Sequence, residues 1–135
     1  MKFTAIVEKG VDGMYSIYVD GMKDHGLYGS GASAEKAKKD MLNALSEMVE
    51  VYKEEGSKTP KELDNPTFVY KYDIASMFDY FDWINVTKLA LKAGINPSLM
   101  RQYKNGLAFA SEKQSSKIQE ALNNLGKELS SALCC

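Results

Sequence analysis

Residues 85–106 read NVTKLALKAGINPSLMRQYKNG, and this stretch decides how the chain is interpreted. Its pattern predicts two short helices, over 86–93 and 97–105, joined by a tight turn. Gly94 stands where the turn needs a positive φ, and Ile95 supplies the apolar side chain that fills the turn. Pro97 suits the first turn of a helix, where its missing N–H is not needed. The arrangement is typical of a helix-turn-helix.

The second predicted helix has one face for the core and one face for a ligand. Met100 and Tyr103 lie three residues apart and are expected to face the core, and Ala90 is small where the two helices cross. The other face carries Ser98, Leu99, Arg101, Gln102 and Lys104. In helix-turn-helix proteins the start of this helix enters the major groove, where Gln pairs with adenine and Arg with guanine. Apolar side chains there meet the thymine methyl group.

Neighbouring residues suit the phosphates of the DNA backbone. Lys88, Lys104 and the hydroxyl of Thr87 are placed for phosphates, and Asn85 stands at the positive start of its helix. Asn96 is the expected N-cap of the second helix. The predicted DNA-contacting set is Asn85, Thr87, Lys88, Asn96, Ser98, Leu99, Arg101, Gln102 and Lys104. The alternative is a helical hairpin that serves only packing or protein contacts.

The charge distribution separates this region from the rest of the chain. The 135 residues hold 17 Lys and Arg and 18 Asp and Glu, and the net charge of -1 by itself argues against a nucleic-acid ligand. Residues 85–127, however, carry seven basic and two acidic side chains, whereas residues 1–70 carry nine basic and twelve acidic ones. The basic residues are Lys88, Lys92, Arg101, Lys104, Lys113, Lys117 and Lys127.

The sequence before this region predicts strands around one long helix. Apolar residues alternate over 2–9 and 14–20, with an Asp12-Gly13 turn between them, and a third short strand fits 25–31. Ser33 is a good N-cap for a helix whose apolar stripe recurs every three or four residues. That stripe consists of Ala34, Ala37, Met41, Leu45, Met48 and Tyr52. Residues 67–72 are β-branched and aromatic, as in a strand.

The period changes at residue 73, after which only helices are predicted, the last beginning with the capping residue Ser111. The predicted fold class is therefore α+β. A domain over 1–72 has a three-stranded antiparallel sheet, a long helix and a fourth strand, and an all-α helix-turn-helix domain follows over 73–135.

Catalysis, cofactors and metals are not expected. Asp12, Asp20 and Asp24 occupy turn positions, where aspartate is favoured for local bonds. His25 has no partner at ligand spacing, and Cys134 and Cys135 are adjacent in a tail. No apolar run approaches the roughly 20 residues of a membrane span, which indicates a cytoplasmic protein with no membrane partner.

Aromatic residues in the predicted strands are also a feature of sheets that bind RNA. Tyr15, Tyr18, Tyr28, Tyr70 and Tyr72 have the chemistry to stack bases on a sheet. The acidic charge of this region opposes a polyanion, so packing against the long helix or a protein partner is the favoured interpretation.

Both halves resemble one family. The order of three strands, helix and strand, with Asp12-Gly-Met-Tyr15 and Gly29-Ser-Gly-Ala-Ser-Ala-Glu-Lys-Ala37, is similar to HicB-like antitoxins, whose fold is a truncated relative of ribonuclease H. The helical part resembles the Cro/repressor type of helix-turn-helix in one branch of that family. The resemblance implies that the first domain neutralises a small RNA-cleaving toxin of the HicA type. It also implies a homodimer, or a higher homo-oligomer, that binds a palindromic operator in double-stranded DNA and represses its own operon.

Two alternatives to the antitoxin stay open. One is a stand-alone DNA-binding regulator whose first domain binds a ligand or a protein. The other is an RNA-binding module.

Overall fold

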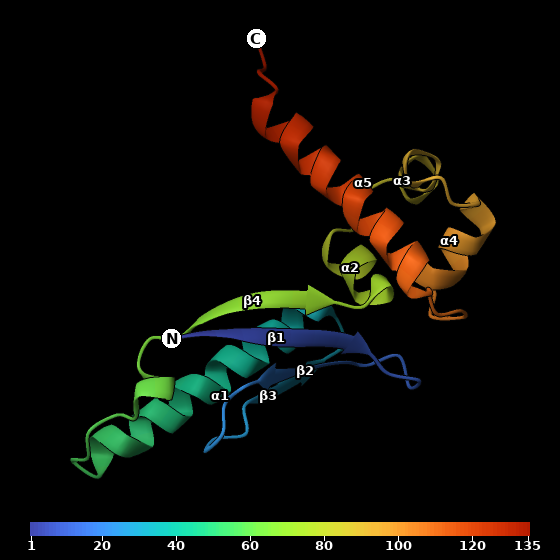
Figure 1. Cartoon of the computed structure of the whole chain (residues 1–135). Coiled ribbons are helices and arrows are strands. Elements are labelled where there is room, and N and C mark those ends of the chain that lie inside the picture. The colour runs from blue at the N-terminus through green and yellow to red at the C-terminus, as the bar shows by residue number, and fades with distance from the viewer. The chain divides into compact units, whose positions relative to one another are not determined.

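A computed structural model describes residues 1–135 as an α+β protein with a four-stranded mixed sheet (Figure 1). The elements are β1 (Lys2–Lys9), β2 (Tyr15–Asp20), β3 (Tyr28–Gly31), α1 (Ala34–Glu54), the 3₁₀ helix η1 (Lys61–Leu63), β4 (Thr67–Tyr72), α2 (Ile74–Tyr80), α3 (Val86–Ala93), α4 (Pro97–Lys104) and α5 (Glu112–Ser131). The chain forms two compact units, residues 1–80 and residues 81–135. None of its helices combines the length and apolarity that a membrane crossing requires.

The sheet of the first unit has the strand order β3-β2-β1-β4. The predicted hairpin is present, with β1 and β2 antiparallel and Val7 opposite Ile17. β3 continues the antiparallel part, whereas β4 runs parallel to β1, with Phe3 opposite Phe68. The sequence predicts the fourth strand but not that this strand lies beside β1. Because β4 joins the sheet, the sheet is four-stranded and mixed instead of three-stranded and antiparallel as predicted.

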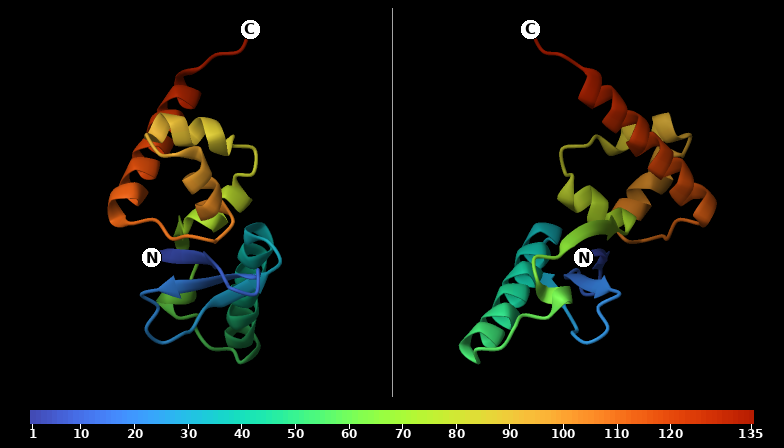
Figure 2. Two further views of the ribbon diagram at one scale, coloured as in Figure 1. Left: turned by 90° about the vertical axis from the view of Figure 1, so that its right-hand side faces the viewer. Right: turned by 60° about the vertical axis from the view of Figure 1, so that its left-hand side comes forward.

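Helix α1 covers one face of this sheet (Figure 2). The residues of β1 and β2 that point toward it, including Val7 and Ile17, are buried together with Ala37 and Met41 of the helix. The inward position of β3 is Gly29, where a Cβ atom would lie 2.4 Å from the carbonyl oxygen of Ala37. The helix backbone therefore rests directly on β3.

Helix α2 belongs to the first unit, although the sequence predicts a boundary after residue 72. Asp73 accepts hydrogen bonds from the backbone N–H groups of Lys9, at 2.9 Å, and Ser76, at 2.7 Å. Asp79 accepts one from the backbone N–H of Ala34, at 2.9 Å. These bonds tie α2 to the end of β1 and the start of α1, and Phe78 of α2 is buried. The division between the units consequently follows Tyr80.

Tyr15 is buried at the start of β2 beside two carboxylates. Burial, followed by the charge of Asp79, a hydrogen bond to Asp79 and the charge of Asp73, raises the pKa of Tyr15 from 10.0 to about 12. The neutral phenol is therefore the form that the folded protein stabilises.

Tyr15→Phe is expected to lower the free energy of unfolding by about 1–2 kcal/mol at neutral pH, because the hydrogen bond to a carboxylate is lost. Since the folded pKa lies above the unfolded one, the contribution of Tyr15 is complete below pH 10 and is lost as the pH rises toward 12. The difference between the two proteins in urea unfolding should shrink across that window. Tyr28→Phe, at an exposed tyrosine, is the control and should leave stability unchanged. A wild-type-to-Tyr15→Phe difference that stays constant to pH 12 would contradict the prediction.

Candidate DNA-contacting surface

The turn between α3 and α4 has the geometry that its sequence predicts. Gly94 adopts a left-handed conformation, with φ of 72°, and ends α3. The backbone N–H of Ile95 donates to the carbonyl oxygen of Ala90 at 2.9 Å, and the Ile95 side chain is buried. Pro97 occupies the first turn of α4. The two short helices and the tight turn are therefore confirmed, with α4 ending at Lys104.

Two asparagines cap these helices. The side-chain oxygen of Asn85 accepts from the backbone N–H of Lys88 at 2.9 Å, and that of Asn96 accepts from Ser98 at 2.8 Å. Both oxygens are thus used inside the protein, and only the amide N–H₂ groups are left to donate to a ligand. The caps fix where each helix starts, and phosphate is the DNA group that such donors suit.

The core of the second unit determines which face of α4 meets solvent. Ala90, Met100 and Tyr103 are buried, as the sequence predicts, together with Ile118 of α5. The opposite face of α4 exposes four predicted residues, Ser98, Arg101, Gln102 and Lys104. Leu99 is half-buried, so it offers a ligand less apolar surface than its place in the sequence indicates.

Arg101 is held in place by two hydroxyl groups. One guanidinium nitrogen donates to Oγ1 of Thr87 on α3 at 3.3 Å, and another donates to Oγ of Ser98 at 3.2 Å. These bonds span the turn and bring together three residues of the predicted set. An arginine has five N–H donors in a rigid fork, so further donors remain for a guanine edge or a phosphate. The sequence predicts that each of these residues contacts DNA, but it does not predict that they contact one another.

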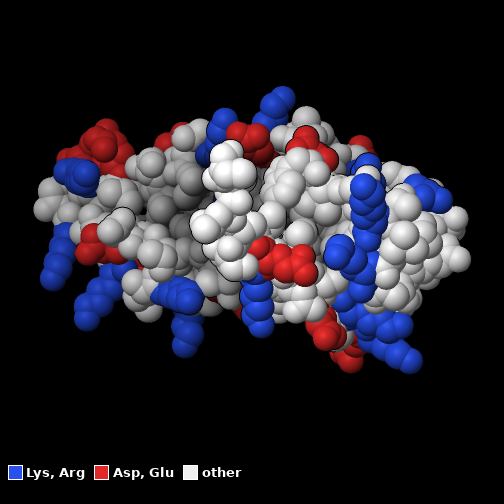
Figure 3. Space-filling view, turned by 90° about the horizontal axis from the view of Figure 1, so that it is seen from above, with Lys and Arg blue, Asp and Glu red and all other residues white.

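The basic side chains near this surface are not neutralised by acidic partners. Lys88, Lys92, Arg101, Lys104 and Lys113 are exposed, and the two salt bridges of the protein both lie in the first unit. Figure 3 shows Lys and Arg side chains gathered in a band at the right of the view, with few acidic side chains among them. Unpaired positive charge of this kind favours a polyanion, because binding releases the counterions of the phosphates.

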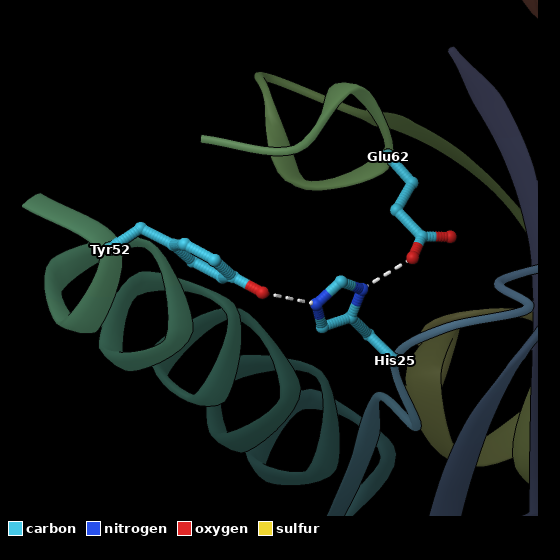
Figure 4. Close-up of polar contacts among 3 residues, drawn as sticks. All are labelled: His25, Tyr52 and Glu62. Carbon is cyan, nitrogen blue, oxygen red and sulfur yellow. Dashed lines mark hydrogen bonds and ion pairs between the residues drawn. The ribbon is translucent and has the colours of Figure 1, made fainter. Parts of the chain in front are cut away.

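A second polar cluster lies in the first unit and joins three segments (Figure 4). Nδ1 of His25, in the β2–β3 connection, pairs with Oε1 of Glu62 in η1, and Nε2 lies 2.9 Å from the hydroxyl of Tyr52 in α1. Both ring nitrogens have a polar partner, so the imidazole links the β2–β3 connection to η1 and to α1. The three residues are far apart in the sequence, which is why the pattern around His25 gives no sign of the cluster.

One of the three carboxylates considered for catalysis has a local hydrogen-bond partner. Asp12 accepts from the backbone N–H of Met14 at 3.0 Å, which is the turn bond that its position predicts. No group of three or more His, Cys, Asp and Glu side chains is placed to hold a metal ion.

Lys38 of α1 contacts tyrosines of β4 and α2. Its ammonium lies 3.8 Å from the ring centre of Tyr70 and 4.4 Å from that of Tyr80, and it donates to the hydroxyl of Tyr80 at 3.1 Å. Burial raises the pKa of the Tyr70 and Tyr72 hydroxyls above the usual value, although Lys38 opposes this shift. Of the five tyrosines considered for RNA stacking, Tyr18 and Tyr28 are exposed, whereas the other three are partly or fully buried.

Comparisons of the chain with protein-family models, with curated proteins and with solved structures find no match.

Proposed function

We propose that the protein is a DNA-binding transcriptional regulator and, in line with the resemblance of its sequence, an antitoxin of the HicB-like kind without enzymatic activity of its own. The observation that carries the DNA-binding part is the position of Arg101. It lies on the exposed face of α4, fixed by Thr87 and Ser98 across a tight turn. An arginine oriented in this way loses little conformational freedom when it meets a base edge.

In this proposal α4 enters the major groove of double-stranded DNA. Arg101 and Gln102 read base edges, with guanine and adenine as their respective partners. Lys88, Lys104 and Thr87 contact phosphates, and the amide groups of Asn85 and Asn96 add donors at the helix starts. Half-buried Leu99 and exposed Ser98 complete the surface beside the bases.

The first unit has the charge and the open surface for a basic protein partner. Residues 1–80 carry fourteen acidic and ten basic side chains. The sheet face opposite α1 exposes Tyr18 by 38%, Tyr28 by 67% and Val69 by 45%. An acidic unit with exposed aromatic and aliphatic side chains suits a small RNA-cleaving toxin, because RNA-binding surfaces are basic.

A stand-alone regulator is the second candidate, and it shares the DNA-contacting surface. The two differ in the partner of the first unit. An adjacent gene for a small basic protein that co-purifies with this chain would support the antitoxin, and the absence of such a gene would support the stand-alone regulator.

Selection from random double-stranded DNA with the full chain tests DNA binding directly. The expected result is an enriched palindrome whose half-sites are about one helical turn apart, or a multiple of that spacing. Binding to that sequence should weaken steeply with salt, as phosphate contacts require. If no sequence is enriched after repeated rounds, the assignment of α4 as a recognition helix is wrong.

A further inference from the structure

The charged side chains of the candidate DNA-contacting surface can donate hydrogen bonds but cannot accept them. Lys88, Arg101 and Lys104 carry N–H donors and no acceptor. The stretch 85–111 contains no Asp and no Glu, so no carboxylate of this stretch accepts beside them. Because the edges of the bases present both donors and acceptors, such one-sided chemistry limits what the surface can recognise.

The two hydroxyl groups of the surface already accept hydrogen bonds inside the protein. Oγ1 of Thr87 accepts from one guanidinium nitrogen of Arg101 at 3.3 Å, and Oγ of Ser98 accepts from another at 3.2 Å. A hydroxyl group carries one proton, which rotates to suit its partners. While each oxygen accepts from Arg101, its proton is left to donate outward. Thr87 and Ser98 therefore act toward a ligand as donors.

The two capping asparagines have the same bias. Oδ1 of Asn85 accepts from the backbone N–H of Lys88 at 2.9 Å, and Oδ1 of Asn96 accepts from that of Ser98 at 2.8 Å. Their side-chain N–H₂ groups are left for a ligand. The unpaired backbone N–H groups at the start of a helix are donors as well.

Gln102 is the exception on this surface. It is exposed on α4 next to Arg101, and its amide offers an acceptor oxygen and two donor N–H groups at one position. Asn105 also has an exposed amide, but it is the C-cap of α4, at the opposite end from the part of a recognition helix that enters the major groove. Among the side chains assigned to bases, Gln102 is therefore the one that both accepts and donates.

The bases differ in the same respect at their major-groove edges. Guanine presents two acceptors, N7 and O6, and thymine presents the acceptor O4. Adenine and cytosine present an amino group, which needs an acceptor, and adenine presents the acceptor N7 beside it. The amide of Gln102 matches the paired donor and acceptor of adenine. The donor groups around it match guanine, thymine and the phosphates.

We propose that the protein recognises DNA half-sites with a single directly read adenine, that Gln102 fixes the position of this adenine, and that the rest of the surface contacts guanine, thymine and phosphate oxygens. The inference rests on the proposed function, because it requires that α4 enters the major groove. It concerns which bases the surface selects, and Gln102 is the residue that determines this choice at the adenine.

Gln102→Glu tests this role, because a carboxylate only accepts. The variant should lose the match to N7 of adenine and favour cytosine, whose amino group donates. Selection from random double-stranded DNA with the full chain should return the wild-type half-site with cytosine in place of that adenine. In competition gel shifts, a preference of about tenfold for the adenine site should become a preference of about tenfold for the cytosine site.

Gln119→Glu is the matched control. It makes the same change of charge at an exposed glutamine of α5 whose amide bonds to Asn123 at 2.9 Å. It should weaken binding slightly and equally for all sequences and select the wild-type half-site. Circular dichroism checks that both variants are folded, as expected at exposed positions. A Gln102→Glu protein that selects the wild-type half-site overturns the proposal.

Removal of single amino groups from the DNA tests the wild-type protein directly. Each adenine of the selected half-site is replaced in turn by purine, which lacks the 6-amino group, and each cytosine by 2-pyrimidinone, which lacks the 4-amino group. One replacement in each half-site should weaken binding about tenfold, and Gln102→Ala should not show this loss. A tenfold loss at two or more positions of a half-site would mean that other groups of the surface accept from bases, which also overturns the proposal.

Failure of this inference can be told apart from failure of the proposed function. A wild type that enriches no DNA sequence contradicts the proposed function, and the inference falls with it. A wild type that enriches a palindrome, but whose choice of bases is unchanged by Gln102→Glu, contradicts only the inference.

Discussion

Gly29→Ala is expected to lower the free energy of unfolding of the first unit by about 3 kcal/mol or more. The added Cβ atom would lie 2.4 Å from the carbonyl oxygen of Ala37 and 2.6 Å from the backbone nitrogen of Met41. Both neighbours are backbone atoms of α1, so no side chain can rotate away to make room. The helix must shift off the sheet, and the packing of Met41 against Val7 and Ile17 is lost with it. Thermal and urea unfolding measure the effect.

Gly126→Ala is the matched control for this substitution. Gly126 lies in α5, where an added Cβ atom would have no neighbour within 4 Å, and its φ is not positive. Alanine there should stabilise the helix by up to about 1 kcal/mol, since glycine is a poor helix former. If Gly29→Ala unfolds within about 1 kcal/mol of the wild type, then α1 does not rest on β3 as tightly as described.

Arg101→Ala is expected to reduce affinity for the selected operator about tenfold to a hundredfold, which corresponds to the roughly 1–3 kcal/mol of a bidentate base contact. Affinity for unrelated DNA should fall much less, so that the ratio of specific to non-specific binding collapses. Arg101→Lys should fail to rescue this ratio, because lysine keeps the charge but lacks the planar fork that Thr87 and Ser98 orient. Competition gel shifts against unrelated DNA give the ratio.

Lys104→Ala provides the contrast to the arginine variants. As a phosphate contact it should weaken binding about equally for all sequences and reduce the salt slope by about one. An Arg101→Ala protein with the wild-type ratio of specific to non-specific binding would show that α4 reads no base through this residue.

Local signals explain why the helix-turn-helix geometry could be predicted. Gly94, Pro97 and the capping Asn85 and Asn96 each act within a few residues of their own position. The same holds for the strands 2–9 and 67–72, whose alternating or β-branched pattern is a property of the segment itself. Such features can be predicted from the sequence because the residues that interact are close neighbours in the chain.

Contacts between distant segments could not be predicted in this way. The parallel pairing of β4 with β1 and the attachment of α2 to the first unit depend on residues far apart in the chain. The contacts of His25 with Tyr52 and Glu62, and of Lys38 with Tyr70, have the same cause. Within the candidate site, the hydrogen bond of Arg101 to Thr87 joins two helices, so the pattern of neither helix predicts it.

The place of β1 in the sheet has a consequence for how the protein is made. β1 lies between β2 and β4, and the backbone N–H of Thr67 donates to the carbonyl oxygen of Met1 at 3.0 Å. Because synthesis proceeds from the N-terminus, β1 can pair with β2 early but waits for residues 67–72 to leave the ribosome before its second edge is closed. During that interval an apolar strand presents unpaired N–H and C=O groups to other nascent chains. A product cut short before β4 would keep this edge open, so we expect truncated chains to aggregate or to be degraded, and only chains that reach the second unit to accumulate.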